Sequence, residues 1–125
     1  MEKVRKIVIF AISLSLIFII FTGTAYATSN DSTELYVCNS GSGNISIIDL
    51  NMNNLTTSID RASMPFSTAI NPDGSRLYVV NEFSGTVSAI NTSTGGLEGT
   101  VRIGFGPHYI ALDMNGTRAL VLCGE

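Results

Sequence analysis

Basic side chains are scarce in this sequence, and their scarcity excludes several kinds of partner. Both lysines, Lys3 and Lys6, lie near the N-terminus, and from Thr28 onward four arginines stand against nine carboxylates, a formal charge of −5. A nucleic-acid surface needs clustered cations that displace counterions from phosphates, and an anionic lipid surface needs them as well. We therefore expect no nucleic-acid partner and no attachment of this acidic part to lipid head groups.

Side chains that carry chemistry are equally few. The chain has one histidine, His108, and two cysteines, Cys38 and Cys123. Phosphate-binding glycine loops and nucleophile elbows are absent, and neither cysteine has a histidine or cysteine neighbour at the spacing of a zinc site. The sequence predicts no catalytic residue, no metal site and no cofactor.

The N-terminal segment has the layout of a secretion signal. A cationic stretch at 3–6 precedes an apolar run at 7–21, and Ala25 and Ala27 supply the small side chains that a signal peptidase accepts. The run of 15 residues is short of the roughly 20 that a membrane-spanning helix needs. We predict a signal-peptide helix over 1–27, cleaved after Ala27, and no stable membrane insertion of the remainder. An uncleaved anchor is the alternative.

The rest of the sequence repeats itself at an offset of 42 residues. Leu35-Tyr36-Val37-Cys38-Asn39 aligns with Leu77-Tyr78-Val79-Val80-Asn81, and the pattern Ser-Gly-x-Ile/Val-Ser-x-Ile-Asp/Asn recurs at 42–49 and 84–91. A third copy begins with Ala119-Leu120-Val121-Leu122. A fixed period of this length indicates stacked supersecondary units.

Each copy is predicted to form four short strands. In the complete copy these are 66–71, 76–81, 86–91 and 97–103, separated by glycine-containing turns. Four strands at a period of about 40 to 45 residues are typical of a β-propeller blade, which buries its two apolar faces against neighbouring blades. The predicted fold is all-β, with about two antiparallel four-stranded blades of a partial propeller after the signal-peptide helix. A small β-sandwich is the alternative.

These residues resemble the YVTN β-propeller repeat, which is common in surface-layer and other cell-surface proteins of archaea and also occurs in bacteria. Leu77-Tyr78-Val79-Val80-Asn81 matches the name-giving stretch with valine in place of threonine, and Ile70-Asn71-Pro72-Asp73-Gly74 matches the turn. The next copy departs there with Met114-Asn115-Gly116, and the first Gly-x-x-Pro reads Ala62-Ser63-Met64-Pro65. The resemblance covers 35–123 and implies a scaffold without fixing an activity.

The domain boundaries follow from the repeat. A linker (28–34) leads to a partial blade (35–61), a full blade (65–103) and a second partial blade (107–123). About nine strands are fewer than a closed propeller of four to eight blades requires. We expect a truncated reading frame, because the last strand carries no polar cap. Assembly of several copies into a ring is the alternative.

The candidate binding residues are His108 and Tyr109, which begin an innermost strand, where propellers line their central channel. Acid–base chemistry would need a positioned partner for His108, and the sequence identifies none. Cys38 and Cys123 fall two blades apart, beyond the roughly 7 Å over which two Cα atoms can be bridged. We therefore expect both cysteines to be free, with no disulfide.

Recurring polar residues are assigned to turns and to the surface. Asn39 and Asn81 precede the hairpins and are expected to cap them through side-chain hydrogen bonds, while Arg76 and Arg118 are interpreted as solvated charges at strand edges. The Asn-x-Ser/Thr glycosylation sequons lie at Asn30, Asn44, Asn54, Asn91 and Asn115. Asn54 and Asn115, in predicted turns, are the expected acceptors.

These patterns predict an exported, cell-surface β-propeller protein that acts as a structural or binding scaffold in the envelope. We expect it not to be an enzyme. Its expected partners are copies of itself or other envelope proteins. The alternative, which the resemblance suggests, is part of a periplasmic propeller enzyme similar to lactonases or to quinoprotein dehydrogenase subunits. Such enzymes draw metal ligands or cofactor contacts from several blades around a channel.

Overall fold

The structure is a computed structural model that describes residues 5–11, 33–60 and 62–124, the first range as backbone only. The described residues form β-strands and no helix. In chain order the strands are β1 (Arg5–Ala11), β2 (Thr33–Asn39), β3 (Asn44–Asp49), β4 (Asn54–Ile59), β5 (Pro65–Ile70), β6 (Arg76–Asn81), β7 (Thr86–Asn91), β8 (Leu97–Arg102), β9 (Pro107–Leu112) and β10 (Ala119–Cys123). They make three sheets, ordered β1-β2-β3-β4, β5-β6-β7-β8 and β9-β10.

The middle sheet is a complete four-stranded antiparallel blade, as the repeat predicted. Successive strands pair in a meander, with Tyr78 of β6 opposite Ala69 of β5 and Ala89 of β7. The turns carry glycines with positive φ, among them Gly74 at 74° and Gly85 at 66°, the conformation that glycine adopts without a Cβ penalty. The four predicted strands of this copy are confirmed within about one residue at each end, the usual spread of strand boundaries.

The first sheet contains a correction to the expected N-terminal helix. Over Arg5–Ala11 the chain forms strand β1, which pairs in parallel with β2 from Thr33 to Asn39. In the middle blade the corresponding place beside the second strand belongs to β5, and the first repeat supplies no such strand. An extended apolar segment satisfies the open ladder of β2 there. Residues 12–32, including the predicted cleavage residues Ala25 and Ala27, lie outside the described residues.

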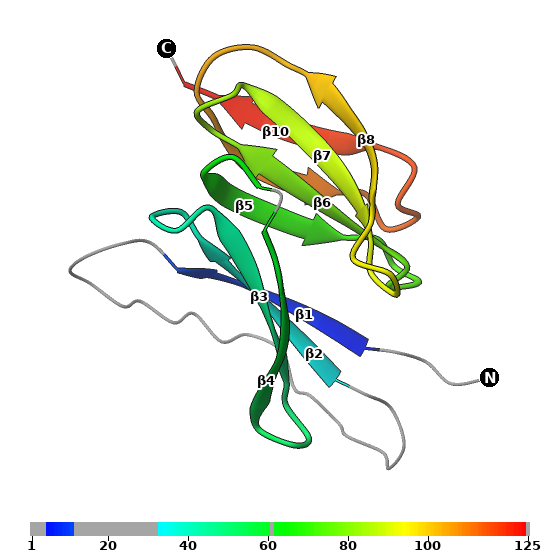
Figure 1. Cartoon of the computed structure of the whole chain (residues 1–125). Coiled ribbons are helices and arrows are strands. Elements are labelled where there is room, and N and C mark those ends of the chain that lie inside the picture. The colour runs from blue at the N-terminus through cyan, green and yellow to red at the C-terminus, as the bar shows by residue number, and fades with distance from the viewer. Residues whose placement is uncertain (1–4, 12–32, 61, 125) are drawn as a thin grey trace.

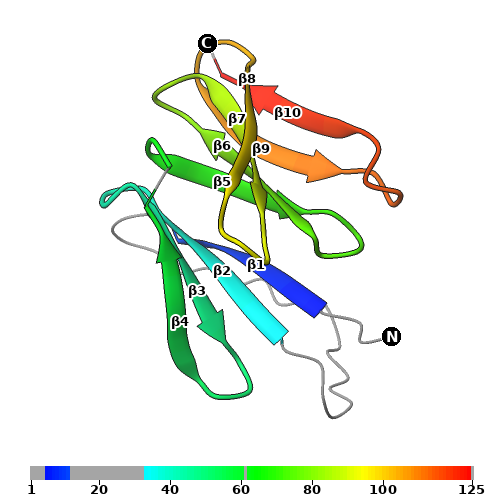
Figure 2. The same cartoon turned by 45° about the vertical axis from the view of Figure 1, so that its right-hand side comes forward.

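The three sheets stack face to face, with the middle sheet between the other two (Figure 1, Figure 2). One buried cluster joins the first two sheets, in which Tyr36 and Cys38 of β2 meet Leu77, Val79 and Ile90, each 2% exposed or less. Complete burial of one such aliphatic side chain contributes about 1.5–3 kcal/mol. Successive side chains of a strand point to opposite faces of the sheet. The even-numbered Tyr36 and Cys38 of the first copy therefore pack against the odd-numbered Leu77 and Val79 of the second, which belong to the opposite face of the repeat. This stacking of three sheets confirms propeller-type blades over the two-sheet sandwich.

Two irregularities recur at the same repeat positions. A β-bulge interrupts the pairing of the outermost strand between Ile47 and Ile48 in the first sheet and between Ala89 and Ile90 in the second. A second bulge interrupts the innermost pairing of β5 with β6, and of β9 with β10, and it leaves Phe66 and His108 without a ladder partner. A bulge bends its strand and re-aims the extra side chain.

Candidate functional site at the junction of the second and third sheets

His108 lies at the bulge of β9, at the end of the sheet where three loops meet. The loops are 62–64 before β5, 82–85 after β6 and 103–106 before β9. The last two are joined by a hydrogen bond from the Ile103 amide to the Gly85 carbonyl, 3.0 Å long. A rigid loop end of this kind holds side chains from two neighbouring blades within reach of one another.

The structure supplies the partner of His108 that the sequence did not identify. Its Nδ1 lies 3.4 Å from Oε1 of Glu82, the first residue after β6, and both side chains are partly open to solvent, 45% and 35% exposed. This distance is long for a direct hydrogen bond, so the contact is mainly electrostatic. A carboxylate beside one ring nitrogen favours the proton on that nitrogen.

The imidazole ring is also fixed from its other sides. Phe66, the equivalent bulge residue of β5, meets it edge to face, with ring centroids 5.3 Å apart at 68°. The amide of Gly124 donates to the Gly106 carbonyl at 2.8 Å, and a methyl group placed on Gly124 would lie 2.8 Å from Nε2 of His108. Glycine at this position therefore lets the backbone approach the ring.

An open hollow adjoins the pair. It has a volume of about 340 Å³ and is lined by Met64, Glu82, Phe83 and Gly106. Three apolar side chains around it are exposed to solvent, Met64 by 45%, Phe83 by 81% and Phe105 by 85%. Exposed aromatic groups next to a few polar ones are the usual composition of a recognition site.

The repeat could have pointed to Glu82. The same position in the first copy is Ser40, and its hydroxyl donates to the carbonyl of Pro65, the first residue of the next innermost strand, at 2.7 Å. In the second copy Glu82 makes the corresponding contact one residue further along, at His108. The position after the second strand thus touches the start of the following blade in both copies.

Tyr109, the other candidate, does not belong to this site. It pairs with Leu122 of β10 and is 49% exposed. Ile110, the next residue, is 2% exposed, and its amide donates to Ser67 of the second sheet. Because consecutive strand residues face opposite ways, Tyr109 lies on the outward face of β9. The structure therefore separates the two residues that the sequence placed together.

The recurring asparagines cap the hairpins, as predicted. Nδ2 of Asn39 donates to Asn44 Oδ1 at 2.8 Å and to Ser46 Oγ at 2.9 Å. Nδ2 of Asn81 donates to the equivalent hydroxyls of Thr86 and Ser88, at 3.2 and 3.0 Å. Their role is architectural.

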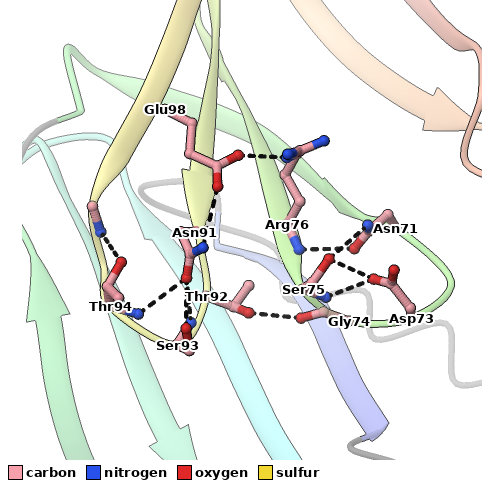
Figure 3. Close-up of polar contacts among 11 residues, drawn as sticks. Asn71, Asp73, Gly74, Ser75, Arg76, Asn91, Thr92, Ser93, Thr94 and Glu98 are labelled. Atoms are coloured by element: carbon pink, nitrogen blue, oxygen red, sulfur yellow. Dashed lines mark hydrogen bonds and ion pairs between the residues drawn. The ribbon is translucent and has the colours of Figure 1, made fainter.

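Arg76 was interpreted as a solvated charge at a strand edge. The structure shows that it is partly exposed but also forms an ion pair. Its Nε donates to Glu98 Oε2, while Glu98 Oε1 accepts from Asn91 Nδ2 at 3.1 Å, which ties β6, β7 and β8 together (Figure 3). Both hydrogen bonds lower the pKa of Glu98 below its ordinary value, and the bond from Asn91 has the larger effect.

The turns that follow the innermost strands carry similar carboxylates. Hydrogen bonds from the Ser75 hydroxyl and amide lower the pKa of Asp73. The pKa of Asp113 is lowered in the same way, mainly by the hydrogen bond from the Thr117 hydroxyl. Each carboxylate accepts from its own turn, at 2.7–3.1 Å. These interactions stabilise loops and leave no group aimed at a ligand.

The two cysteines lie in different environments. Cys38 is 1% exposed in the core and Cys123 is exposed, and neither forms a disulfide with the other. Burial raises the pKa of Cys38 to about 11, against a smaller opposing effect of the Thr68 hydroxyl. Cys38 therefore remains a neutral thiol that packs as an apolar side chain.

The sequons differ in how free their side chains are. Asn91 accepts from the amides of Ser93 and Thr94 and donates to Glu98, and Asn44 accepts from Asn39. The remaining described sequon residues, Asn54 and Asn115, are exposed. Asn115 lies in a turn, as predicted, whereas Asn54 is the first residue of β4 and not a turn residue. Asn30 lies outside the described residues.

Within ranges 5–11, 33–60 and 62–124, no group of three or more His, Cys, Asp or Glu side chains is placed to hold a metal ion. In the same ranges no helix is long and apolar enough to cross a membrane. The candidate site therefore consists of His108, Glu82 and the apolar side chains around them.

No protein-family model and no curated protein matches the chain, but solved structures of β-propeller proteins do. Hydrazine synthase of Kuenenia stuttgartiensis superposes with a TM-score of 0.70 at 26% identity, over 72% of this chain and 26% of that one. The dihydro-heme d1 dehydrogenase NirN, solved in complex with DHE, gives 0.59 at 22%, over 69% and 18%. The WD40 β-propeller domain of Doa1 gives 0.62 at 16%, over 76% and 31%. The chain thus spans less than a third of each of these proteins, and the likeness shows the propeller-type fold.

Proposed function

We propose that this chain is an exported β-propeller protein of the YVTN type that serves as a binding scaffold at the cell surface. The observation that carries the proposal is the loop end of the blades, where Met64, Phe83 and Phe105 are exposed around the His108–Glu82 pair. An apolar rim beside a carboxylate suits a partner that presents an apolar group next to a hydrogen-bond donor. A protein segment of the cell envelope has this chemistry.

Export is supported by the order of cationic, apolar and small residues in 1–27. Cleavage after Ala27 would also remove strand β1 from the first sheet. Its test is the N-terminus of the product recovered from the host. We expect an intact mass that begins at Thr28, in the envelope or the medium, and retention of the whole chain when Ala27→Phe blocks the peptidase. A wild-type product that keeps Met1 and stays in the cytoplasm would refute export.

Binding at the loop end is tested with a double variant, Phe83→Ser with Phe105→Ser, against Met114→Ser as the matched control. Met114 is 94% exposed in a turn away from the site, so its replacement removes an exposed apolar side chain without touching the hollow. We expect at least about a tenfold weaker binding to isolated envelope fragments for the double variant, which corresponds to roughly 1.4 kcal/mol. Equal binding by both variants would contradict a site here.

A second candidate function is part of a propeller enzyme. The observation that favours it is the pairing of His108 with Glu82, together with the likeness at 26% identity to hydrazine synthase, an enzyme by its name. Turnover of a lactone, or stoichiometric uptake of a redox cofactor by the purified chain, would favour this candidate, provided that His108→Gln abolishes it. Absence of both activities leaves the scaffold.

A further inference from the structure

One face of the third sheet is apolar and exposed. Tyr109, Leu120 and Leu122, which we call the head face, are 49%, 67% and 55% exposed. The register places Leu122 opposite Tyr109 in the β9–β10 ladder, so these side chains share one side of the sheet. Contiguous apolar surface of this kind marks an interaction site in a soluble protein.

The same face is covered in the earlier copies. At the positions of Tyr109 and Leu122, the second sheet has Ser67 and Val80, both fully buried. Ser67 Oγ accepts from the Ile110 amide of the third sheet at 3.2 Å, which shows that this face looks toward the next sheet. In the first sheet the same face carries Tyr36 and Cys38, which correspond to Leu120 and Leu122, and both are buried as well.

Within the chain, the opposite face of the next sheet covers this face. Leu77, Val79 and Ile90 of the second sheet pack against Tyr36 and Cys38 of the first. The equivalent side chains of the first sheet are Leu35, Val37 and Ile48, which we call the tail face. They are half-buried, and Leu35 lies opposite Ile48 in the ladder.

We propose that the head face of one copy of this chain docks on the tail face of a second copy and repeats the contact between the first two sheets. The occupant follows from continuity with that internal interface, in which the same repeat positions already pack to complete burial. Each chain brings two four-stranded sheets and one two-stranded sheet. Two copies joined head to tail in both directions therefore stack six sheets, two of them half-blades, within the four to eight blades of a closed propeller. The pair then forms a closed two-fold assembly. This inference rests on the fold and is independent of the proposed function.

The test measures the oligomeric state of the full chain by size-exclusion chromatography with light scattering over a range of concentrations. We expect a two-copy assembly for the wild type. Leu122→Glu should weaken it by at least about 100-fold, because a carboxylate would be buried in an apolar contact without a partner. Met114→Glu, the same chemical change at an exposed turn residue, should leave the assembly intact.

Mixing distinguishes head-to-tail contact from any other arrangement. Val37→Glu blocks the tail face, so it should be monomeric alone, as Leu122→Glu is. A mixture of the two variants retains one intact pair of faces and should form a heterodimer. Cooperative thermal unfolding by circular dichroism verifies that Val37→Glu is folded; where it is not, Val37→Thr, which keeps the shape and suits a strand, takes its place.

Three outcomes overturn the proposal. A wild-type monomer up to about 100 µM, a typical range for weak association, would show that the head face does not bind a second copy. A dimer that survives Leu122→Glu would place the contact elsewhere. A Val37 variant that is folded and still fully dimeric would indicate head-to-head contact instead.

Discussion

A single asparagine joins three segments at the end of the second strand. Asn81 is 3% exposed, donates to Thr86 and Ser88, and accepts from the amide of Ser63 at 3.2 Å. Replacement by alanine removes these three hydrogen bonds, each of which contributes about 0.5–1.5 kcal/mol.

We therefore expect Asn81→Ala to destabilise the folded state by about 2–3 kcal/mol in urea unfolding. Asn115→Ala, at an exposed turn position, is the control and should change the midpoint little. An unchanged midpoint for Asn81→Ala would show that solvent replaces these bonds without cost.

The two thiols are expected to react at very different rates. Cys38 is buried with its pKa raised to about 11, while Cys123 is exposed, and only an accessible thiolate is an effective nucleophile. A maleimide at neutral pH should label one site rapidly, at Cys123 by peptide mapping, and the second only in denaturant. Rapid labelling of both would mean that the first two sheets separate readily.

Cys38 also links stability to alkaline pH. Its folded pKa lies above the ordinary 9.0, so the unfolded chain releases the proton first. The stability that it contributes is therefore present below pH 9 and declines as the pH rises from about 9 to 11. Replacement by alanine or serine should remove that decline while lowering stability at neutral pH.

At the scale of one element, the β6–β7 turn depends on the absence of a side chain. Gly85 has a φ of 66°, and a Cβ there would lie 2.1 Å from the Gly104 carbonyl oxygen. Left-handed backbone alone costs a non-glycine residue about 1–2 kcal/mol, and the clash forces the 103–106 loop away. Gly41, where an added Cβ meets nothing within 4 Å, provides the control.

We expect Gly85→Ala to destabilise the chain by at least about 2 kcal/mol, and Gly41→Ala to change stability by less than about 0.5 kcal/mol, as surface substitutions usually do. Chemical denaturation measures both. Because the turn forms one wall of the hollow, Gly85→Ala should also reduce envelope binding in the folded fraction. Equal stability of the two variants would contradict the loop contact.

The sequence was sufficient for the elements that the repeat defines. Tyr36 and Tyr78 lie at equivalent ladder positions because the apolar alternation and the turn glycines recur at one period. It was not sufficient for β1, since an apolar segment is compatible with a signal helix in a membrane and with an added strand beside an open edge. Nor did it yield the pairing of Glu82 with His108, which depends on a bulge and on a contact between two blades.

For the whole molecule, acid should be destabilising in a defined range. Asp73, Glu98 and Asp113 all have pKa values lowered by hydrogen bonds in the folded state. Their stabilising contribution is present above the ordinary values of 3.8 and 4.5 and is lost as the pH falls below them toward the folded values.

The melting temperature should therefore fall below about pH 4.5, and fall less in Glu98→Gln, which removes one of these carboxylates. High salt should reduce the part due to Arg76, since that pair is partly exposed. A melting temperature that stays constant from pH 6 to pH 3 would contradict the three lowered pKa values.

The repeated bulge on the outermost strands affects whether a further strand can pair with β4 or β8. At Ile47/Ile48 and at Ala89/Ile90 the ladder loses register just before the sheet ends, which twists β4 and β8 out of the plane that an incoming strand would need. Lateral extension into a continuous fibril-like sheet is thereby discouraged on the solvent side. Copies that associate as proposed above would therefore stack face to face rather than edge to edge.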